Sequence, residues 1–403
     1  MQRTSNRVTN QTFFAEHLSS SKGMLLLLGI CLLVAIQSIR HFTVITVGKL
    51  RTDKTFYRRE DFPSPIQFKH GETGKSVHHI VFLKVPKAAS TTIANIFLRY
   101  GDEKNLIFAV PRNHKPGGYS FTSQYFLPPP KNRSYDIACA HARYNRTHYS
   151  KVFPNDTVYI AIMREPFQHF KSYVRFFRPK RILHIPGKNP VLNFLSSNEK
   201  TWNSSARAEP ICNSMARYLG FPRRLFFQKW NQSIAEEFIH KLKMEIDLVL
   251  ILEFLDESLV LMRRMLNWDL RHVLHGRLHV TKSQDLRLKF GTDEANLHKK
   301  CAHLDYQLYG LFFRKLKETL KTQPPDFFEE VAYFRKVRVK YNNFCSSAMS
   351  ETDLHSTTAF EGSVWNKPFV ISREHCKKLI IQDVDFLDYL LEKQNVSEDV
   401  FVK

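Results

Sequence analysis

Three short apolar runs, each followed by a polar turn and a helical pattern, constrain the fold of this chain more than any other feature. Continuous apolar runs of this length are typical of strands buried on both faces. Strands that alternate with helices indicate a mostly parallel, doubly wound sheet with helices on both faces, which is an α/β fold. The three runs are residues 79–83, 157–163 and 248–252.

The segments after these runs predict where the helices begin and end. Apolar residues at helical spacing predict a helix over residues 92–99, and Gly101 is expected to stop it. Pro166 suits the first position of a second helix, and residues 256–258 lead into a third. Since ligands of such sheets bind at the carboxyl ends of the strands, the turns that follow the strands are the candidate sites.

Length and charge limit the class of protein. With 403 residues, 43% of them hydrophobic, the chain can form one α/β domain of roughly 250 to 330 residues with extra segments at either end. The net charge of +22 implies a negatively charged partner, which could be a nucleic acid, an anionic membrane or a small phosphate or sulfate compound. Lys and Arg are scattered through apolar segments and form no basic tail, which argues against nucleic acid.

Residues 23–39 form an uncharged apolar segment between Lys22 and Arg40. About 17 residues is the short end of a membrane span, and the basic residues before it predict a cytosolic N-terminus. We therefore expect a cytosolic tail at 1–22, a transmembrane signal anchor at 23–39 and a luminal remainder. A cleaved signal peptide is the alternative, but the polar lead is long for one and no clear cleavage site follows.

Residues 40–77 are polar and basic, which indicates a stem that precedes a luminal domain over residues 78–403. Beyond Cys31 in the apolar segment there are five cysteines, so at least one stays unpaired or bonds a second chain, which leaves a homodimer open. No Cys/His spacing suggests a metal. Glycosylation sequons after the apolar segment support luminal exposure. They begin at Asn132, Asn145, Asn155, Asn203, Asn231 and Asn395.

The turn after the first strand has the composition of a phosphate cradle. Small residues let backbone N–H groups approach a phosphate, the following helix N-terminus favours an anion, and hydroxyls and a mobile lysine add donors. The turn lacks the glycines of the nucleoside-triphosphatase loop, so an ordinary capped strand-to-helix turn is the alternative. The candidate residues are Lys84, Lys87, Ala88, Ala89, Ser90, Thr91 and Thr92.

The turn after the second strand offers a second anion site. Arg164 ends that strand, and Ser172 lies about two turns into the following helix. A guanidinium and a hydroxyl can bracket one phosphate, so two sites on adjacent strand ends would suit a nucleotide phosphorylated at both its 5′ and 3′ positions. A structural salt bridge for Arg164 and a surface hydroxyl for Ser172 are the alternatives.

Several stretches of the chain resemble the Golgi galactose-3-O-sulfotransferases and follow one another in the order found in that family. The resemblance covers roughly residues 80–315 and continues more weakly to Cys376. The resemblance implies a sulfotransferase fold related to the P-loop kinases, the sulfate donor 3′-phosphoadenosine 5′-phosphosulfate (PAPS), a carbohydrate acceptor, a Golgi membrane location and no metal. The matching stretches are residues 82–84 with Lys87 and 89–90, then 139–141, 155–157, 164–166 with Ser172, and 252–261.

The resemblance also implies roles for single residues. Lys87 would contact the 5′-phosphosulfate and stabilise the leaving oxygen, with Lys84 as a weaker candidate for donor binding. His141, after a strand expected at residues 137–140, would accept the proton of the sugar hydroxyl, most simply the 3-OH of a terminal galactose on a glycolipid or glycoprotein. Cys345 and Cys376 match cysteines of the family and are expected to form a disulfide.

The chain also departs from the family. The sequence Val-Pro-Lys at residues 85–87 resembles the corresponding stretch of the uronyl 2-O-sulfotransferases instead. Residues 176–203 show little resemblance, and the basic Lys180, Arg181 and Lys188 within them would suit an acidic or sulfated glycan. The match at Trp268 is interpreted as a core aromatic residue and not as a sugar-stacking one.

Two other functions stay open from the sequence. A non-catalytic module would keep the cradle and bind PAPS without turnover. A glycosyltransferase with a metal-bound sugar nucleotide would need an Asp-x-Asp motif, and residues 383–385 have this sequence. Because Ile380, Val384, Leu387 and Leu391 fall on one helical face, the two aspartates are interpreted as solvated surface.

Overall fold

The computed structural model describes residues 74–112, 119–120, 126–130, 132–177, 179–197, 211–227, 230–276, 288–350 and 355–393. All of them fall within one compact unit, Pro63–Lys403. The expected tail and membrane anchor, and the stem up to residue 73, lie outside the described residues, as do the sequons at Asn203 and Asn395. Among the described helices, none is both long and apolar enough to cross a membrane.

A four-stranded parallel sheet forms the centre of the described part, in the order β3-β1-β5-β6. Ile80 of β1 pairs with Val158 of β5, and Ile160 of β5 pairs with Leu248 of β6. All residues of these strands are buried, which explains why the strands read as continuous apolar runs. The strands are β1 (Ile80–Leu83), β3 (Ile137–Ala138), β5 (Val158–Met163) and β6 (Leu248–Ile251).

Helices follow the strands as the sequence predicts. They are α3 (Ser90–Lys104) after β1, α5 (Pro166–Phe177) after β5 and α11 (Leu255–Leu266) after β6. The expected stop at Gly101 is wrong, because α3 continues to Lys104 and ends at Asn105 in the left-handed conformation. Gly101 serves close packing instead, since a Cβ there would collide with the ring of Phe108.

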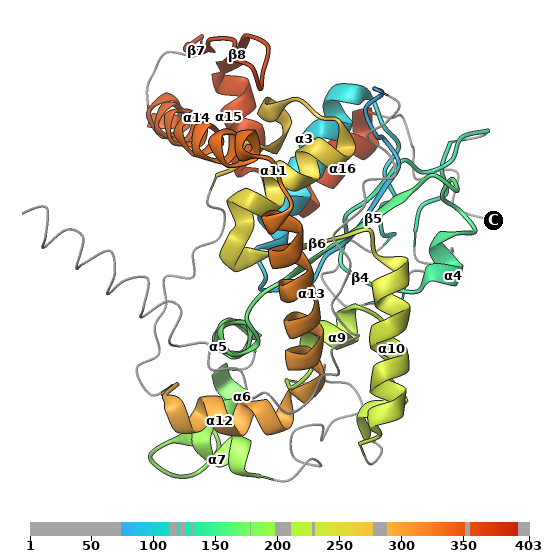
Figure 1. Ribbon diagram of the computed structural model, residues 1–403, viewed down its shortest axis with the longest axis vertical. Helices are drawn as coiled ribbons and strands as arrows, with labels where there is room; N and C mark the ends of the chain where they lie inside the picture. The colour runs from blue at the N-terminus through green and yellow to red at the C-terminus, as the bar shows by residue number, and fades with distance from the viewer. Residues whose placement is uncertain are drawn as a thin grey trace, which may run out of the picture. The chain divides into compact units, whose positions relative to one another are not determined.

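Two groups of helices pack against the sheet. Helices α3, α11, α14, α15 and α16 contact one another, whereas α5, α9, α12 and α13 form a second group (Figure 1). This flanked, mostly parallel sheet confirms the predicted α/β architecture. The remaining helices are α4 (Arg146–Tyr149), α6 (Pro179–Leu183), α7 (Pro190–Ser196), α9 (Ser214–Tyr218), α10 (Gln232–Glu245), α12 (Thr292–Cys301), α13 (His303–Lys321), α14 (Pro325–Ser350), α15 (Arg373–Ile380) and α16 (Asp383–Lys393).

Short elements complete the described part. The 3-10 turns are η2 (Arg223–Phe227), η3 (Leu252–Phe254) and η4 (Leu270–Val273). The strands outside the central sheet are β2 (Tyr119–Ser120) paired with β4 (Ala142–Arg143), and β7 (Thr357–Phe360) paired with β8 (Phe369–Ser372). Trp268 is buried and stacks on Tyr100 with ring centroids 3.6 Å apart, which confirms its interpretation as a core aromatic residue.

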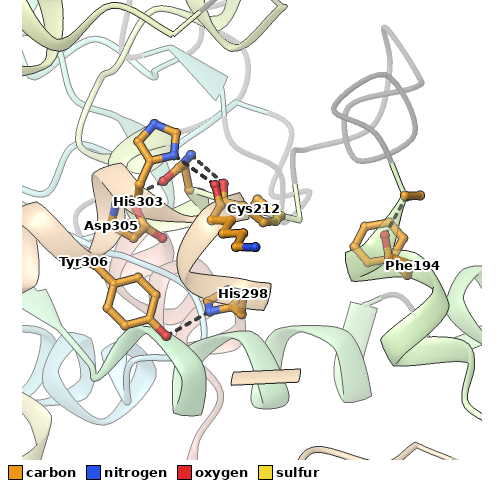
Figure 2. Close-up of a disulfide and its surroundings, with 10 residues drawn as sticks. Phe194, Cys212, His298, His303, Asp305 and Tyr306 are labelled. Carbon is orange, nitrogen blue, oxygen red and sulfur yellow. Dashed lines mark hydrogen bonds between the residues drawn. A yellow bond between two sulfur atoms is a disulfide. The ribbon is translucent and has the colours of Figure 1, made fainter. Parts of the chain in front are cut away.

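Two disulfides join segments distant in the sequence. Cys345 of α14 bonds Cys376 of α15, which confirms the pairing implied by the family resemblance. The other bond, between Cys212 and Cys301, was not predicted (Figure 2). Cys139 is the unpaired cysteine of the described part, and it is buried, so it is not placed to bond a second chain.

The disulfide between Cys212 and Cys301 lies beside a buried carboxylate, that of Asp305 (Figure 2). This carboxylate accepts the backbone N–H groups of Met215 and Ala216 at the start of α9, at 3.1 and 2.7 Å. Burial raises the pKa of Asp305 to about 7, even though these N–H groups act in the opposite direction. The carboxylate thus ties α9 to α13, while the disulfide ties the segment before α9 to the end of α12.

Candidate active site

The loop between β1 and α3 has a backbone shape suited to an anion. Lys87 and Ala89 both adopt the left-handed conformation, with φ of 63° and 60°, which is uncommon for residues other than glycine. Turns of this kind gather successive backbone N–H groups into an anion-binding concavity. Each such residue costs conformational energy, so two of them in one loop make this loop a candidate functional segment.

The N-terminus of α3 continues this surface. Ala89 is its N-cap and makes no side-chain capping hydrogen bond, and the first turn has no acidic residue. The first N–H groups of a helix lack partners within the helix, and the helix dipole favours a negative charge beside them. Among the predicted hydroxyl donors of this turn, Thr91 is partly exposed, whereas Ser90 and Thr92 are buried; Ala88 is buried as well.

Two side chains, one from the turn after β5 and one from α5, hold the carbonyl oxygens of this loop. Nε2 of His169 donates to the oxygen of Pro86 at 2.8 Å, and Nη1 of Arg164 donates to the oxygen of Lys87 at 3.2 Å. In a trans peptide the N–H points away from the C=O. The N–H of Lys87 therefore points away from His169, and the N–H of Ala88 points away from Arg164.

The motif Arg164-Glu165-Pro166 can be explained residue by residue. Arg164 supports the loop after β1, as described. Glu165 caps α5, because its carboxylate accepts the N–H groups of Phe167 and Gln168 at 3.1 and 2.7 Å. Pro166 is the first residue of α5, as predicted. This short motif thus begins the helix and links it to the loop.

The cationic end of Lys87 lies on an exposed aromatic ring. Its Nζ is 3.8 Å from the ring centroid of Phe176, whose side chain is 57% exposed. Burial, and then the charge of Arg164, lowers the pKa of Lys87. Ser172 is partly exposed on α5, and no hydrogen bond connects it with Arg164 in the described part of the chain.

His141 lies just after β3 with its imidazole fixed in one tautomer. Its Nδ1 is 2.9 Å from the carbonyl oxygen of Lys84, and because a carbonyl only accepts, Nδ1 carries the proton. Nε2 is then the basic nitrogen. Burial lowers the pKa of His141, and the charge of Lys84 lowers it further, so the imidazole stays neutral. The ring of Tyr218 packs edge-on against it, with centroids 6.2 Å apart.

Lys84 lies at the end of β1, but its side chain points away from the loop. The side chain is fully buried, and its ammonium forms an ion pair with the carboxylate of Asp383. Asp383 is the first residue of α16. The structure therefore places Lys84 next to His141, while its charge is directed at α16.

The interpretation of both aspartates of residues 383–385 as solvated surface is wrong for Asp383. Asp385 is exposed, but the carboxylate of Asp383 contacts Lys84. The expected single helical face does not exist, because α15 ends at Ile380, which is exposed, and α16 begins anew at Asp383. No group of three or more His, Cys, Asp or Glu residues that could hold a metal ion occurs in the described ranges.

Comparison with known proteins identifies the family. A family model described as galactose-3-O-sulfotransferase matches residues 14–363. The chain belongs to this family.

Individual members of the galactose-3-O-sulfotransferase family are moderately similar to the chain. Galactose-3-O-sulfotransferase 2 of Homo sapiens is 31% identical over 262 residues, which is 62% of this chain and 63% of the relative. Galactose-3-O-sulfotransferase 3 of Bos taurus is 28% identical over 58% of this chain and 55% of the relative. Galactosylceramide sulfotransferase of Homo sapiens is 27% identical over 51% of this chain and 49% of the relative. The chain thus spans about half to two thirds of the length of these relatives.

In this galactose-3-O-sulfotransferase family member, the site residues predicted from sequence come together in part. Arg164 and Lys87 are joined by a hydrogen bond, and His141 and Lys84 by another. Sequence reasoning missed His169 and interpreted Asp383 as a solvated surface residue. His169 lies on the buried face of α5, where the pattern suggests only a core residue, and Asp383 follows the region matched by the family model.

The basic residues expected to meet an acidic acceptor lie on or beside α6 and α7. Lys180 and Lys188 are exposed, while the side chain of Arg181 lies outside the described residues. Lys188 immediately precedes Asn189, whose side chain caps α7 by accepting the N–H of Leu192 at 3.1 Å.

Proposed function

We propose that this protein is a carbohydrate sulfotransferase that moves a sulfuryl group from PAPS to a hydroxyl of galactose, most specifically the 3-OH of a terminal galactose. Membership in the galactose-3-O-sulfotransferase family supports the reaction class. The observation that carries the proposal is the neutral imidazole of His141, oriented with Nε2 as its basic atom, beside a loop whose N–H groups and Lys87 suit an anion.

The reaction is a direct transfer between two substrates. The galactose oxygen attacks sulfur, a new S–O bond forms, and the S–O bond to the 5′-phosphate of PAPS breaks. The proton of the galactose hydroxyl passes to Nε2 of His141, which needs the neutral tautomer found here. The ammonium of Lys87 stabilises the negative charge that develops on the bridging oxygen of 3′-phosphoadenosine 5′-phosphate (PAP), the nucleotide that leaves.

The remaining residues bind and position the donor. The loop N–H groups and the N-terminus of α3 receive the 5′-phosphosulfate, as in the P-loop-kinase-related fold to which we assign this domain. Arg164 and Ser172 receive the 3′-phosphate; Arg164 contributes from the end of β5 and Ser172 from α5. Lys84 contributes through its backbone carbonyl, which orients His141. The chemistry requires no metal.

The structure offers a reason to prefer this function over a glycosyltransferase that uses an Asp-x-Asp motif. Such an enzyme needs both aspartates to hold a metal-bound sugar nucleotide. The carboxylate of Asp383 is instead engaged by the ammonium of Lys84, and Asp385 is exposed on the other side of the helical turn. The two side chains therefore do not converge on one site.

We also propose that the protein is a type II single-pass protein of the Golgi membrane with its catalytic domain in the lumen. The apolar segment at residues 23–39 and the sequons support this location. The two disulfides add support, because disulfides persist in oxidising compartments. Protease protection in sealed vesicles, glycosidase sensitivity and co-staining with a Golgi marker test it; cleavage of the C-terminal part in intact vesicles would contradict it.

The reaction is tested with the full chain, ³⁵S-labelled PAPS and a panel of acceptors. The panel contains galactosylceramide, lactosylceramide, oligosaccharides that end in galactose, and desulfated heparan sulfate. Label on the 3-OH of terminal galactose that disappears in Lys87→Ala and His141→Ala supports the proposal. Label on uronic acid would make the protein a 2-O-sulfotransferase instead, and PAPS binding without any labelled product would make it a binding module.

A further inference from the structure

Lys84 connects two groups that are far apart in the sequence. Its backbone carbonyl accepts the Nδ1–H of His141 at 2.9 Å, and its ammonium forms an ion pair with Asp383. The lysine side chain is fully buried, whereas that of Asp383 is 22% exposed. One residue at the end of β1 thus holds the imidazole with its main chain and the first residue of α16 with its side chain.

We propose that Asp383 is a positioning residue of the sulfuryl-transfer site: it holds the ammonium of Lys84 beside His141 and so maintains the surroundings in which the imidazole acts as a base. The inference rests on the proposed function, in which Nε2 of His141 accepts the proton of the galactose hydroxyl. Asp383 touches neither substrate nor donor in this proposal, and it acts through Lys84.

Electrostatics gives this contact a consequence for His141. The groups that face the imidazole are Lys84 immediately after β1, Asp383 from α16 and the ring of Tyr218 from α9. Burial lowers the pKa of His141 most, and the charge of Lys84 comes next. Asp383 acts in the opposite direction, but as the smallest of these influences.

Removal of the carboxylate would therefore change His141 indirectly. A buried ammonium without a counter-charge is unfavourable, so its side chain leaves its place or loses its charge. In either case the positive charge beside the imidazole is lost. The pKa of His141 then rises toward its ordinary value of 6.5, and a larger fraction of the base is protonated in mildly acidic buffer.

A role in anchoring α16 is the competing explanation, and the chain offers a matched control for it. Lys393, at the other end of α16, donates to Asp102 of α3 at 2.7 Å. Lys393→Gln removes an ion pair that fastens the same helix, α16, to α3, and it does not touch Lys84. Asp385→Asn is a second control, because it removes an exposed charge one turn or less from Asp383.

The first measurement is turnover of the full-length variants Asp383→Asn, Asp383→Glu, Lys84→Met, Lys393→Gln and the double variant of Lys84→Met with Asp383→Asn. We expect Asp383→Asn to lower kcat about 10- to 100-fold with nearly unchanged affinity for PAP. Asp383→Glu should recover much of the rate. The double variant should be no slower than Lys84→Met, because the two residues act through one contact.

The second measurement does not depend on turnover. Diethyl pyrocarbonate modifies neutral imidazoles, and mass spectrometry of the peptide that contains His141 reports its neutral fraction at each pH. In the parent protein and in Lys393→Gln, His141 should stay reactive well below pH 6.5. In Asp383→Asn and Lys84→Met, His141 should lose its reactivity at a pH about one unit or more above that found for the parent protein.

The outcomes separate the two proposals. If the parent protein sulfates no acceptor, the proposed function fails, yet the reactivity of His141 still decides whether Asp383 sets its surroundings. If Asp383→Asn retains the parent rate and reactivity profile, or if Lys393→Gln reproduces its defects, the positioning role is overturned. Should Asp383→Asn not fold, Lys84→Met must shift the reactivity of His141 and Asp383→Glu must not; any other pattern also overturns it.

Discussion

Nε2 of His169 donates to the carbonyl oxygen of Pro86 at 2.8 Å, and this buried contact links α5 to the loop that follows β1. Burial lowers the pKa of His169 to about 4, so the ring is neutral and carries its proton on the nitrogen that faces the loop. The candidate anion-binding loop after β1 is therefore coupled to α5 through one imidazole, which sequence alone would place in the core.

His169→Phe should weaken donor binding without touching a group that contacts the donor. The phenyl ring fills a similar volume, but it leaves the Pro86 carbonyl buried without its donor, which costs about 1–3 kcal/mol. We expect the dissociation constant for PAP, measured by calorimetry, to rise about tenfold or more. His148→Phe, on α4 and partly exposed, is the control and should bind PAP as the parent does. Unchanged binding in His169→Phe would show that the loop holds its shape unaided.

Ala89 should accept glycine far better than a branched residue. Its φ of 60° lies in the left-handed region, which glycine adopts without steric cost and valine almost never does. Ala89→Val is expected to destabilise the loop by about 1–3 kcal/mol and to weaken PAP binding, whereas Ala89→Gly should retain binding. Thermal unfolding and PAP titration of both variants provide the measurement, and equal behaviour of the two would contradict the loop conformation.

The two disulfides should differ in their contribution to stability. The bond between Cys212 and Cys301 closes 89 residues of sequence, and the bond between Cys345 and Cys376 closes 31. Because a longer closed loop restricts the unfolded chain more, removal of the first pair should cost about 1 kcal/mol more than removal of the second. Denaturant unfolding of the two double Cys→Ala variants tests the order, and a larger loss from the shorter loop would refute it.

Stability should fall as the pH is lowered from 7 to 5. Burial lowers the pKa of His169 to about 4, of His275 to about 4 and of His298 to about 3. The unfolded chain binds protons at these residues near pH 6.5, whereas the folded chain does not. Each of the three histidines therefore lowers the free energy of unfolding by about 2 kcal/mol between pH 7 and pH 5.

Asp305 opposes this trend. Its pKa is raised to about 7, so its folded form takes up a proton over the same range and regains about 2 kcal/mol. These three histidines and Asp305 together lower the free energy of unfolding by about 4 kcal/mol between pH 7 and 5, and the buried His141 acts in the same direction, which denaturant unfolding measures. Asp305→Asn should steepen the loss, and a free energy of unfolding that rises toward pH 5 would contradict the assignment of neutral histidines.

The sequence by itself determined the elements of the sheet and the class of site. Continuous apolar runs at residues 80–83, 158–163 and 248–251 can be buried on both faces only in a covered parallel sheet. Local patterns also predicted that a helix begins at Pro166, which the structure confirms, and they identified Lys87 and Arg164 as candidate ligands at adjacent strand ends. These features are local, because each depends on a few neighbouring residues and on the general rule that parallel strands end at one edge.

The tertiary structure decided what depends on contacts across the chain. From the sequence, Gly101 is predicted to stop a helix, but in the structure the ring of Phe108 packs against it and leaves no room for a Cβ. From the sequence, Asp383 is predicted to be a surface residue, but in the structure α16 places its carboxylate against the ammonium of Lys84, which lies 299 residues earlier. The physical reason is the same in both cases: a side chain's role follows from its partner, and long-range partners are chosen by packing, which local sequence patterns do not encode.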